Sequence, residues 1–163
     1  MSTLSPGELI IRPAVKADID AIFSLIELYT ENGVVLKRSK DDIAVYLPNF
    51  IVAERNGSVC GCCAARDFGN DLLEVRSLVV SPACQGQGIG KKLVQFIIDK
   101  LNTERKTWRL FTLTLQVEFF RTLGFVVVEK ESFPEKIWSD CSKCPKFNSC
   151  DETALLLNSP DGQ

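Results

Sequence analysis

The chain has 163 residues, of which 45% are hydrophobic and 25% charged, and no apolar run approaches the about 18 residues that a membrane-spanning helix needs. Its 19 Lys and Arg against 21 Asp and Glu give a net charge of −2, without the basic surplus expected of a nucleic-acid-binding protein. Because the sequence has no histidine, a histidine general base, a Ser-His-Asp triad and the usual ligands of a zinc hydrolase are all excluded.

The first half of the chain predicts a strand, two helices and then an antiparallel meander. Apolar residues recur at helical spacing after Ala17, and Ser39 is typical of an N-cap that begins a second helix. Asn56-Gly57 is the dipeptide that most readily forms a two-residue hairpin turn, so strands are expected on both sides of it. The predicted elements are a strand at 8–12, a helix at 17–29, a helix at 39–47, and strands at 50–54, 58–65 and 72–80.

The second half predicts a strand-helix-strand crossover followed by shorter elements. Ser81-Pro82 ends the strand at 72–80, and apolar residues on one face of the next segment indicate a helix. The predicted elements are a helix at 88–101, a strand at 108–113, a helix at 117–123, a strand at 125–129 and a last edge strand at 153–157.

The turn between the strand at 72–80 and the following helix contains three glycines, Gly86, Gly88 and Gly90. Closely spaced glycines let backbone N–H groups face outward, and a helix N-terminus adds a positive dipole end, so the turn is suited to a pyrophosphate. Lys91 and Lys92 add positive charge just beyond the turn. The alternative to an anion-binding role is that the turn only tightens packing between the strand and the helix. Two familiar phosphate-binding motifs fit this turn poorly. A Walker loop would need Lys then Ser or Thr after its last glycine, whereas Gly90 is followed by Lys91 and Lys92. A dinucleotide fingerprint normally lies in the first strand-helix unit of a parallel sheet, whereas this turn follows a predicted antiparallel meander.

The residues around this turn resemble the GNAT acetyltransferase superfamily. Gln85-Gly86-Gln87-Gly88-Ile89-Gly90 is similar to its acyl-CoA loop, and Leu78 to Pro82 and Phe119 to Phe125 resemble its pantetheine-binding strand end and its aromatic helix. The resemblance implies an α/β (α+β) GNAT fold, with a mixed, mostly antiparallel central sheet of six to seven strands flanked by about four helices. It also implies acetyl-CoA as co-substrate, bound by Leu78, Val79, Val80, Gln85, Gly86, Gln87, Gly88, Ile89, Gly90, Lys91, Phe119 and Phe120.

A closer resemblance is to the short amino-acid acetyltransferases related to N-acetylglutamate synthase, the first enzyme of arginine biosynthesis. Four stretches support it, namely 36–39, 74–78, 110–114 with 118–120, and 140–146. The resemblance implies that the acceptor is the α-amine of an amino acid, most of all glutamate, with direct transfer in a ternary complex. We expect one domain over residues 1–163, with a cysteine-containing segment at about 131–152.

Glu74 is the candidate general base. Alternation along the predicted strand places Glu74 and Arg76 on the face shared with Leu78 and Val80. An α-amine has a reference pKa of about 8, so a base must take a proton before the nitrogen can attack the thioester. The histone acetyltransferase branch of the superfamily carries its catalytic glutamate at the position that Glu74 resembles; the alternative is a solvated or structural ion pair with Arg76.

Arg38 and Arg76 are the candidate substrate-binding residues, because guanidinium groups bind carboxylates bidentately. The alternative is two surface arginines. Backbone N–H groups near Leu78 are expected to meet the oxyanion. Many GNAT enzymes carry a tyrosine general acid where this chain has Phe120, so no general acid is assigned.

Seven cysteines, an odd number, indicate reduced thiols rather than a secreted disulfide framework, and residues 1–8 lack the pattern of a targeting segment. We therefore expect a cytoplasmic protein. Cys141, Cys144 and Cys150 leave metal binding open, since zinc would need a fourth ligand.

The expected partners are acetyl-CoA and an amino acid, with no nucleic acid and no membrane, and a homodimer stays open. A protein or polyamine acceptor, or a non-catalytic acetyl-CoA sensor, are the alternative functions.

Overall fold

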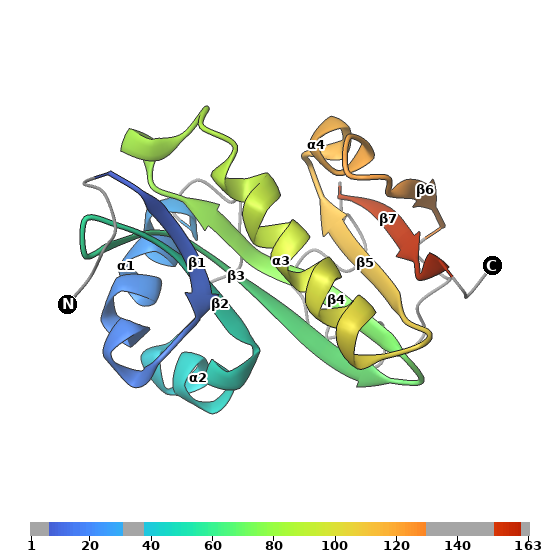
Figure 1. The fold of residues 1–163 in the computed structure, drawn as a ribbon, viewed down its shortest axis with the longest axis horizontal. Helices are drawn as coiled ribbons and strands as arrows, with labels where there is room; N and C mark the ends of the chain where they lie inside the picture. The colour runs from blue at the N-terminus through green and yellow to red at the C-terminus, as the bar shows by residue number, and fades with distance from the viewer. Residues whose placement is uncertain (1–6, 31–37, 130–151, 161–163) are drawn as a thin grey trace. The chain divides into compact units, whose positions relative to one another are not determined.

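The computed structural model describes residues 7–30, 38–129 and 152–160, which form seven strands, four α-helices and three short 3₁₀ helices in these ranges (Figure 1). The strands are β1 (Leu9–Pro13), β2 (Phe50–Arg55), β3 (Ser58–Gly69), β4 (Leu72–Val80), β5 (Arg109–Thr114), β6 (Val126–Val128) and β7 (Thr153–Asn158). The helices are α1 (Ile19–Thr30), α2 (Lys40–Val45), α3 (Ile89–Glu104) and α4 (Val117–Arg121).

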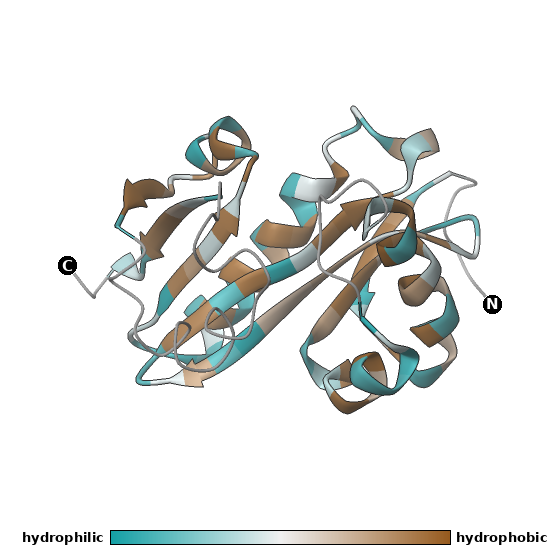
Figure 2. Ribbon diagram, turned by 180° about the vertical axis from the view of Figure 1, so that it is seen from behind, coloured by the Kyte–Doolittle hydropathy of each residue, from teal (hydrophilic) through white to brown (hydrophobic). Residues whose placement is uncertain are grey.

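The strands form one sheet in the order β1-β2-β3-β4-β5-β7-β6. β4 and β5 are parallel, as the connection through α3 requires, whereas β1 with β2, β2 with β3, β5 with β7 and β7 with β6 are antiparallel. The predicted mixed, mostly antiparallel sheet with about four helices is therefore confirmed. Figure 2 shows the strands coloured largely as hydrophobic, as expected of a sheet that packs against helices.

The chain divides into two compact units, the first made of Met1–Ala65 with Val75–Lys100 and the second of Arg66–Glu74 with Leu101–Gln163. In the first unit, α1 and α2 cover one face of β2 and β3 (Figures 1 and 2). The buried core on that face consists of Ile22, Leu25, Ile26, Ile43, Phe50, Val52, Cys62, Ala64 and Val79.

The first turns of α3 approach β3 closely at Gly61, in the first unit. A Cβ atom built at Gly61 would lie 3.2 Å from the carbonyl oxygen of Val79 and 3.3 Å from side-chain atoms of Ile89 and Leu93. Glycine at this position therefore allows the start of α3 to lie against the strands.

The second unit contains β5, β6, β7 and α4, with a small core around Leu72, Phe111 and Ala154. Phe120 of α4 packs edge-to-face on Phe125, with ring centroids 5.2 Å apart. Gly124 turns the chain between them with a φ of 98°.

Most predicted elements are confirmed, and two details were wrong. Asn56 and Gly57 have positive φ angles of 53° and 77°, as the predicted hairpin turn requires. The hydroxyl of Ser39 accepts a 3.0 Å hydrogen bond from the N–H of Asp42, as an N-cap does. However, β3 continues to Gly69 rather than ending near residue 65, and β7 pairs with both β5 and β6 and is not an edge strand.

None of the described helices has both the length and the apolar character that crossing a membrane requires. The expected single domain over residues 1–163 stays a prediction, and its cysteine-containing segment at 131–152 lies almost wholly outside the described residues.

Candidate active site

The glycine-rich turn begins where β4 ends, and its geometry depends on glycine. Gly86 and Gly88 have φ angles of 81° and 76°, and a Cβ atom at either position would meet no atom within 4 Å. Their role is therefore to adopt positive φ, not to make room for a neighbour. Both glycines and Gln87 between them are exposed immediately before the first turn of α3. The structure thus presents an accessible backbone turn at a helix N-terminus, the arrangement that suits a phosphate anion.

Backbone hydrogen bonds fix the start of this turn on β3. The N–H of Ser81 donates to the carbonyl of Cys60 at 2.8 Å, and the N–H of Cys84 donates to the carbonyl of Ser81 at 2.9 Å. The second bond closes the short 3₁₀ turn Pro82–Cys84. The turn therefore starts from a fixed point on the sheet.

Tyr29, at the C-terminal end of α1, contacts the same turn and was missed by the sequence reasoning. Its hydroxyl donates a 2.6 Å hydrogen bond to the carbonyl of Val80, the last residue of β4. The side-chain amide of Gln85 in turn donates to the Tyr29 hydroxyl. The signal available in the sequence was a lone tyrosine at the end of a helix, and nothing local connects it with residues more than 50 positions away.

Glu74 is a buried carboxylate, 4% exposed, on the part of β4 that pairs with β5. It belongs to the second unit, where it lies opposite Phe111 in the parallel ladder. Burying a carboxylate is unfavourable unless polar groups compensate, so proteins retain such a group for a structural partner or for chemistry. The burial of Glu74 argues against the solvated reading, whereas a catalytic role and a structural ion pair with Arg76 both stay predictions.

Ser77 interrupts β4 in a way that the sequence did not predict. Its φ is 55°, in the left-handed region that a serine rarely adopts. Side chains alternate between faces only while the backbone stays extended. The expectation that Glu74, Arg76, Leu78 and Val80 share one uninterrupted face was therefore wrong across Ser77.

Arg38 is held beside this irregular point of β4, in the first unit. Its Nε donates to Oδ2 of Asp42 at 2.7 Å, and its Nη1 donates to the Ser77 hydroxyl at 3.1 Å. The guanidinium also lies over the rings of Tyr46 and Phe50, 5.7 and 5.1 Å from their centroids. The Arg38 side chain is only 11% exposed. It is thus a fixed arginine and not the solvated surface residue of the alternative reading.

The remaining candidate residues differ in their exposure. Arg76 is half-buried on β4, and Lys91 is exposed on the first turn of α3. Phe119 is half-buried on α4, whereas Phe120 is 3% exposed and packs edge-to-face with Phe119 at 5.0 Å. The observed contacts of Phe120 are those of a core residue, and a role for either ring in cofactor binding stays a prediction.

Four of the cysteines lie in the described residues and are free thiols: Cys60, Cys62, Cys63 and Cys84. Burial raises the pKa of Cys62 to about 12 and that of Cys63 well above its usual value. In the described part of the chain, no three His, Cys, Asp or Glu residues are grouped as metal ligands. Cys141, Cys144 and Cys150 lie outside the described residues.

Comparison with known proteins identifies the class. The acetyltransferase (GNAT) domain model matches residues 47–127. A Chlorobaculum tepidum protein named as an uncharacterised N-acetyltransferase is 40% identical over 146 residues, which are 90% of this chain and 94% of that protein. The chain therefore belongs to the GNAT acetyltransferase family, and it is an N-acetyltransferase that uses acetyl-CoA as co-substrate.

More specific similarities concern amino-acid acetyltransferases. The Mycobacterium tuberculosis amino-acid acetyltransferase is 32% identical over 123 residues, covering 74% of this chain and 70% of that protein. The solved structure of Neisseria gonorrhoeae N-acetylglutamate synthase, complexed with coenzyme A and N-acetyl-glutamate, superposes with a TM-score of 0.82 at 30% identity. That match covers 94% of this chain and 36% of the synthase chain, so this chain corresponds to about a third of that synthase.

Proposed function

We propose that this acetyltransferase transfers the acetyl group of acetyl-CoA to the α-amine of an amino acid, glutamate above all, as N-acetylglutamate synthase does in arginine biosynthesis. The observation that supports it most is the similarity to the M. tuberculosis amino-acid acetyltransferase, because the match covers more than two thirds of both chains. The fixed guanidinium of Arg38 in the first unit is the feature of this molecule that suits an acidic acceptor.

The proposed reaction is a direct transfer in a ternary complex. Glu74, directly or through a water molecule, takes a proton from the α-ammonium group of the acceptor. The free amine then attacks the thioester carbonyl, and a C–N bond forms to give a tetrahedral oxyanion. Backbone N–H groups near Leu78 stabilise that oxyanion. The C–S bond then breaks and CoA leaves as a thiolate, while the excess proton on the nitrogen of the new amide passes to the thiolate or to water. No separate general acid is assigned, because a thiol has a pKa of about 8.5.

Arg38 and Arg76 are proposed to bind the carboxylates of the acceptor. In the structure, Arg38 uses Nε and Nη1 for Asp42 and Ser77, and its Nη2 donates no hydrogen bond to a described residue. A carboxylate could therefore be bound through Nη2 without displacing Asp42. Arg76 is half-buried on the strand that also carries Glu74.

The proposed cofactor contacts follow the chain. Leu78, Val79 and Val80 would hold the pantetheine arm with backbone groups. The turn from Gln85 to Gly90, together with Lys91, would hold the phosphates, and Phe119 and Phe120 complete the proposed set. Since the carbonyl of Val80 already accepts a hydrogen bond from Tyr29, the pantetheine amides would use other backbone groups of this strand end.

The experiment that tests this proposal measures the release of CoA thiol from acetyl-CoA in the presence of glutamate, glutamine, aspartate or lysine. Turnover confined to glutamate or glutamine, and lost in Glu74→Gln, is the expected result. Acetyl-CoA binding without turnover on any free amino acid would refute the proposed acceptor and indicate a protein or polyamine substrate, or a sensor.

The location of the cofactor has its own test. Gly88→Trp places a large side chain at the exposed turn and on a backbone angle that non-glycine residues rarely adopt. We expect acetyl-CoA affinity to fall steeply in this variant, as measured by calorimetry. Unchanged affinity would show that the phosphates bind elsewhere. A cytoplasmic location is a further part of the proposal, for fractionation to test, and ultracentrifugation would decide between a monomer and a homodimer.

A further inference from the structure

Arg55 also contacts the glycine-rich turn, although it lies on the β2–β3 hairpin. It is the last residue of β2, where it pairs with Leu9 of β1 on one side and with Ser58 of β3 on the other. The backbone of Arg55 is therefore fixed by strands on both sides. Its Nη1 donates a hydrogen bond to the side-chain oxygen of Gln87, the residue between Gly86 and Gly88.

The Nε donor of Arg55 lacks an acceptor among the described residues. This nitrogen is buried, and no other buried side-chain nitrogen or oxygen in the described ranges is in this condition. No carboxylate forms an ion pair with Arg55 in the described parts of the chain. A buried donor on a permanently charged group is unfavourable without an acceptor, so a site of this kind is suited to an anion.

The thiol of Cys60 lies close enough to Arg55 for the two groups to interact electrostatically. Burial and the neighbouring thiol of Cys84 raise the pKa of Cys60, whereas the positive charge of Arg55 lowers it in part. The Cys60 thiol is therefore largely neutral at pH 7 and provides no negative charge for the guanidinium. Lys91 and Lys92 add two exposed positive charges at the start of α3, in the same unit as Arg55.

We propose that Arg55 binds a phosphate group of acetyl-CoA from the β2–β3 hairpin. Its partner is either the diphosphate or the 3′-phosphate, and a guanidinium can bind either one bidentately. The inference rests on the proposed function only in placing the phosphates at the glycine-rich turn. Arg55 is thus a cofactor-binding residue that supplies charge which the backbone of the turn cannot.

The test compares Arg55→Gln and Arg55→Lys with the wild type, with Lys106→Gln as a control that removes an exposed positive charge in the second unit. Circular dichroism and thermal melting establish that each variant is folded. Calorimetry then measures the Kd of acetyl-CoA at several salt concentrations, and steady-state kinetics separate KM from kcat.

We expect Arg55→Gln to raise the Kd and KM for acetyl-CoA by about 10-fold or more with kcat little changed, since a charge-assisted bidentate contact is lost. Arg55→Lys should recover part of the affinity. The salt dependence of the Kd should weaken in Arg55→Gln, because one charge pair fewer is screened. A merely structural role in holding Gln87 would leave the salt dependence unchanged, which would overturn the proposal.

Acetyl-CoA lacking the 3′-phosphate identifies the partner. If the 3′-phosphate is bound, the effect of Arg55→Gln disappears with this analogue; if the diphosphate is bound, the effect persists. An Arg55→Gln variant that binds acetyl-CoA as tightly as Lys106→Gln refutes this inference alone. If Gly88→Trp instead binds acetyl-CoA as tightly as the wild type does, the placement of the cofactor on which the inference rests is refuted.

Discussion

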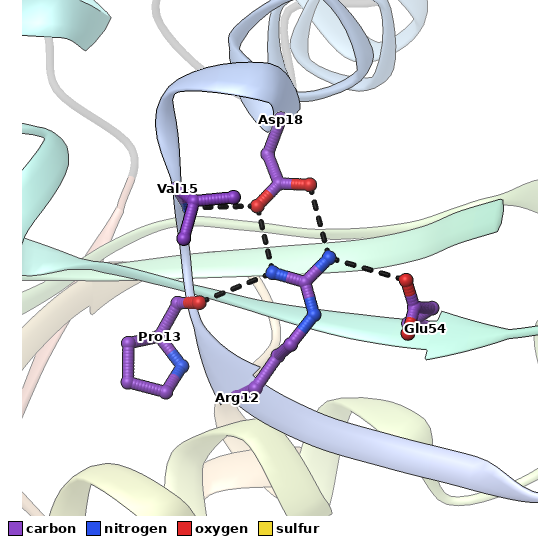
Figure 3. A network of polar contacts seen from close by, with 5 residues as sticks. All are labelled: Arg12, Pro13, Val15, Asp18 and Glu54. Carbon is purple, nitrogen blue, oxygen red and sulfur yellow. Dashed lines mark hydrogen bonds and ion pairs between the residues drawn. The ribbon is translucent and has the colours of Figure 1, made fainter. Parts of the chain in front are cut away.

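Asp18→Asn tests the polar network at the start of α1, which Figure 3 shows. Arg12, on β1, donates to the two carboxylate oxygens of Asp18 at 2.8 and 3.0 Å, and the N–H of Val15 donates to the same group at 2.8 Å. Arg12 also donates to Glu54 of β2 at 3.2 Å. The Asp18 side chain is 7% exposed and that of Arg12 27%, so this ion pair is only partly screened by solvent.

The expected cost of Asp18→Asn is about 2 kcal/mol in the free energy of unfolding. Asparagine keeps one acceptor oxygen but loses the charge, and it presents an NH2 group to one of three donors. A hydrogen bond to a charged group contributes about 1.5–3 kcal/mol. Because Arg12 is partly exposed, solvent screens its interaction with Asp18, and the expected cost lies at the low end of what these hydrogen bonds could contribute together. For a chain of this size the melting temperature should fall by about 4–8 °C.

The pH dependence follows from the direction of the pKa shift. The hydrogen bonds from Arg12 lower the pKa of Asp18 below its ordinary value of 3.8 in the folded protein. Near pH 4 the unfolded chain therefore binds more protons than the folded one, and the stability that Asp18 provides is lost as the pH falls through the folded pKa. The difference between wild type and Asp18→Asn should be full above about pH 4 and shrink below it.

Urea denaturation of both proteins from pH 7 to pH 3 measures this difference. Asp20→Asn is the matched control, because Asp20 lies two residues away but is 85% exposed and pairs with Lys40, which is itself 54% exposed. That variant should show almost no change at any pH. An Asp18→Asn protein as stable as Asp20→Asn at pH 7, or a difference that persists undiminished at pH 3, would refute the reasoning.

Three further changes give distinct results. Tyr29→Phe removes the hydroxyl that bonds Val80 and Gln85, and steady-state kinetics should show a several-fold higher KM for acetyl-CoA; an unchanged KM would mean that the turn holds its shape without this contact. Gly61→Ala places a Cβ atom 3.2 Å from a carbonyl oxygen, so thermal melting should show a loss of about 1–2 kcal/mol, and a neutral result would mean that α3 shifts freely. Ser39→Ala removes the N-cap of α2 and should cost about 1 kcal/mol in urea denaturation, which Ser39→Asp should restore.

Local sequence signals predicted the elements well where one short motif determines the backbone. Asn56-Gly57 predicted the hairpin and Ser39 the start of α2, because a turn or a cap depends on a few adjacent residues. The glycine-rich turn was predicted for the same reason, as its positive φ angles require glycine.

Features that depend on distant partners were not predictable in this way. From the sequence alone, β7 is predicted to be an edge strand, whereas in the structure it pairs with both β5 and β6. The order of strands in a sheet depends on contacts between residues that are far apart in the sequence. The positive φ of Ser77 has no local signal, since serine does not mark such a position. The contacts of Tyr29 with Val80 and of Arg55 with Gln87 join residues 51 and 32 positions apart.

The two ends of α1 are fixed by different contacts: Asp18 binds Arg12 just before the helix begins, and Tyr29 binds Val80 where the helix ends. A helix fastened at both ends cannot fray independently, because opening either end breaks a buried or half-buried polar contact. The amides at the C-terminal end of α1 should therefore exchange with solvent deuterium mainly in openings that also release the last residue of β4. Hydrogen exchange at this end of α1 would then report how often the start of the glycine-rich turn opens, even in the absence of any ligand.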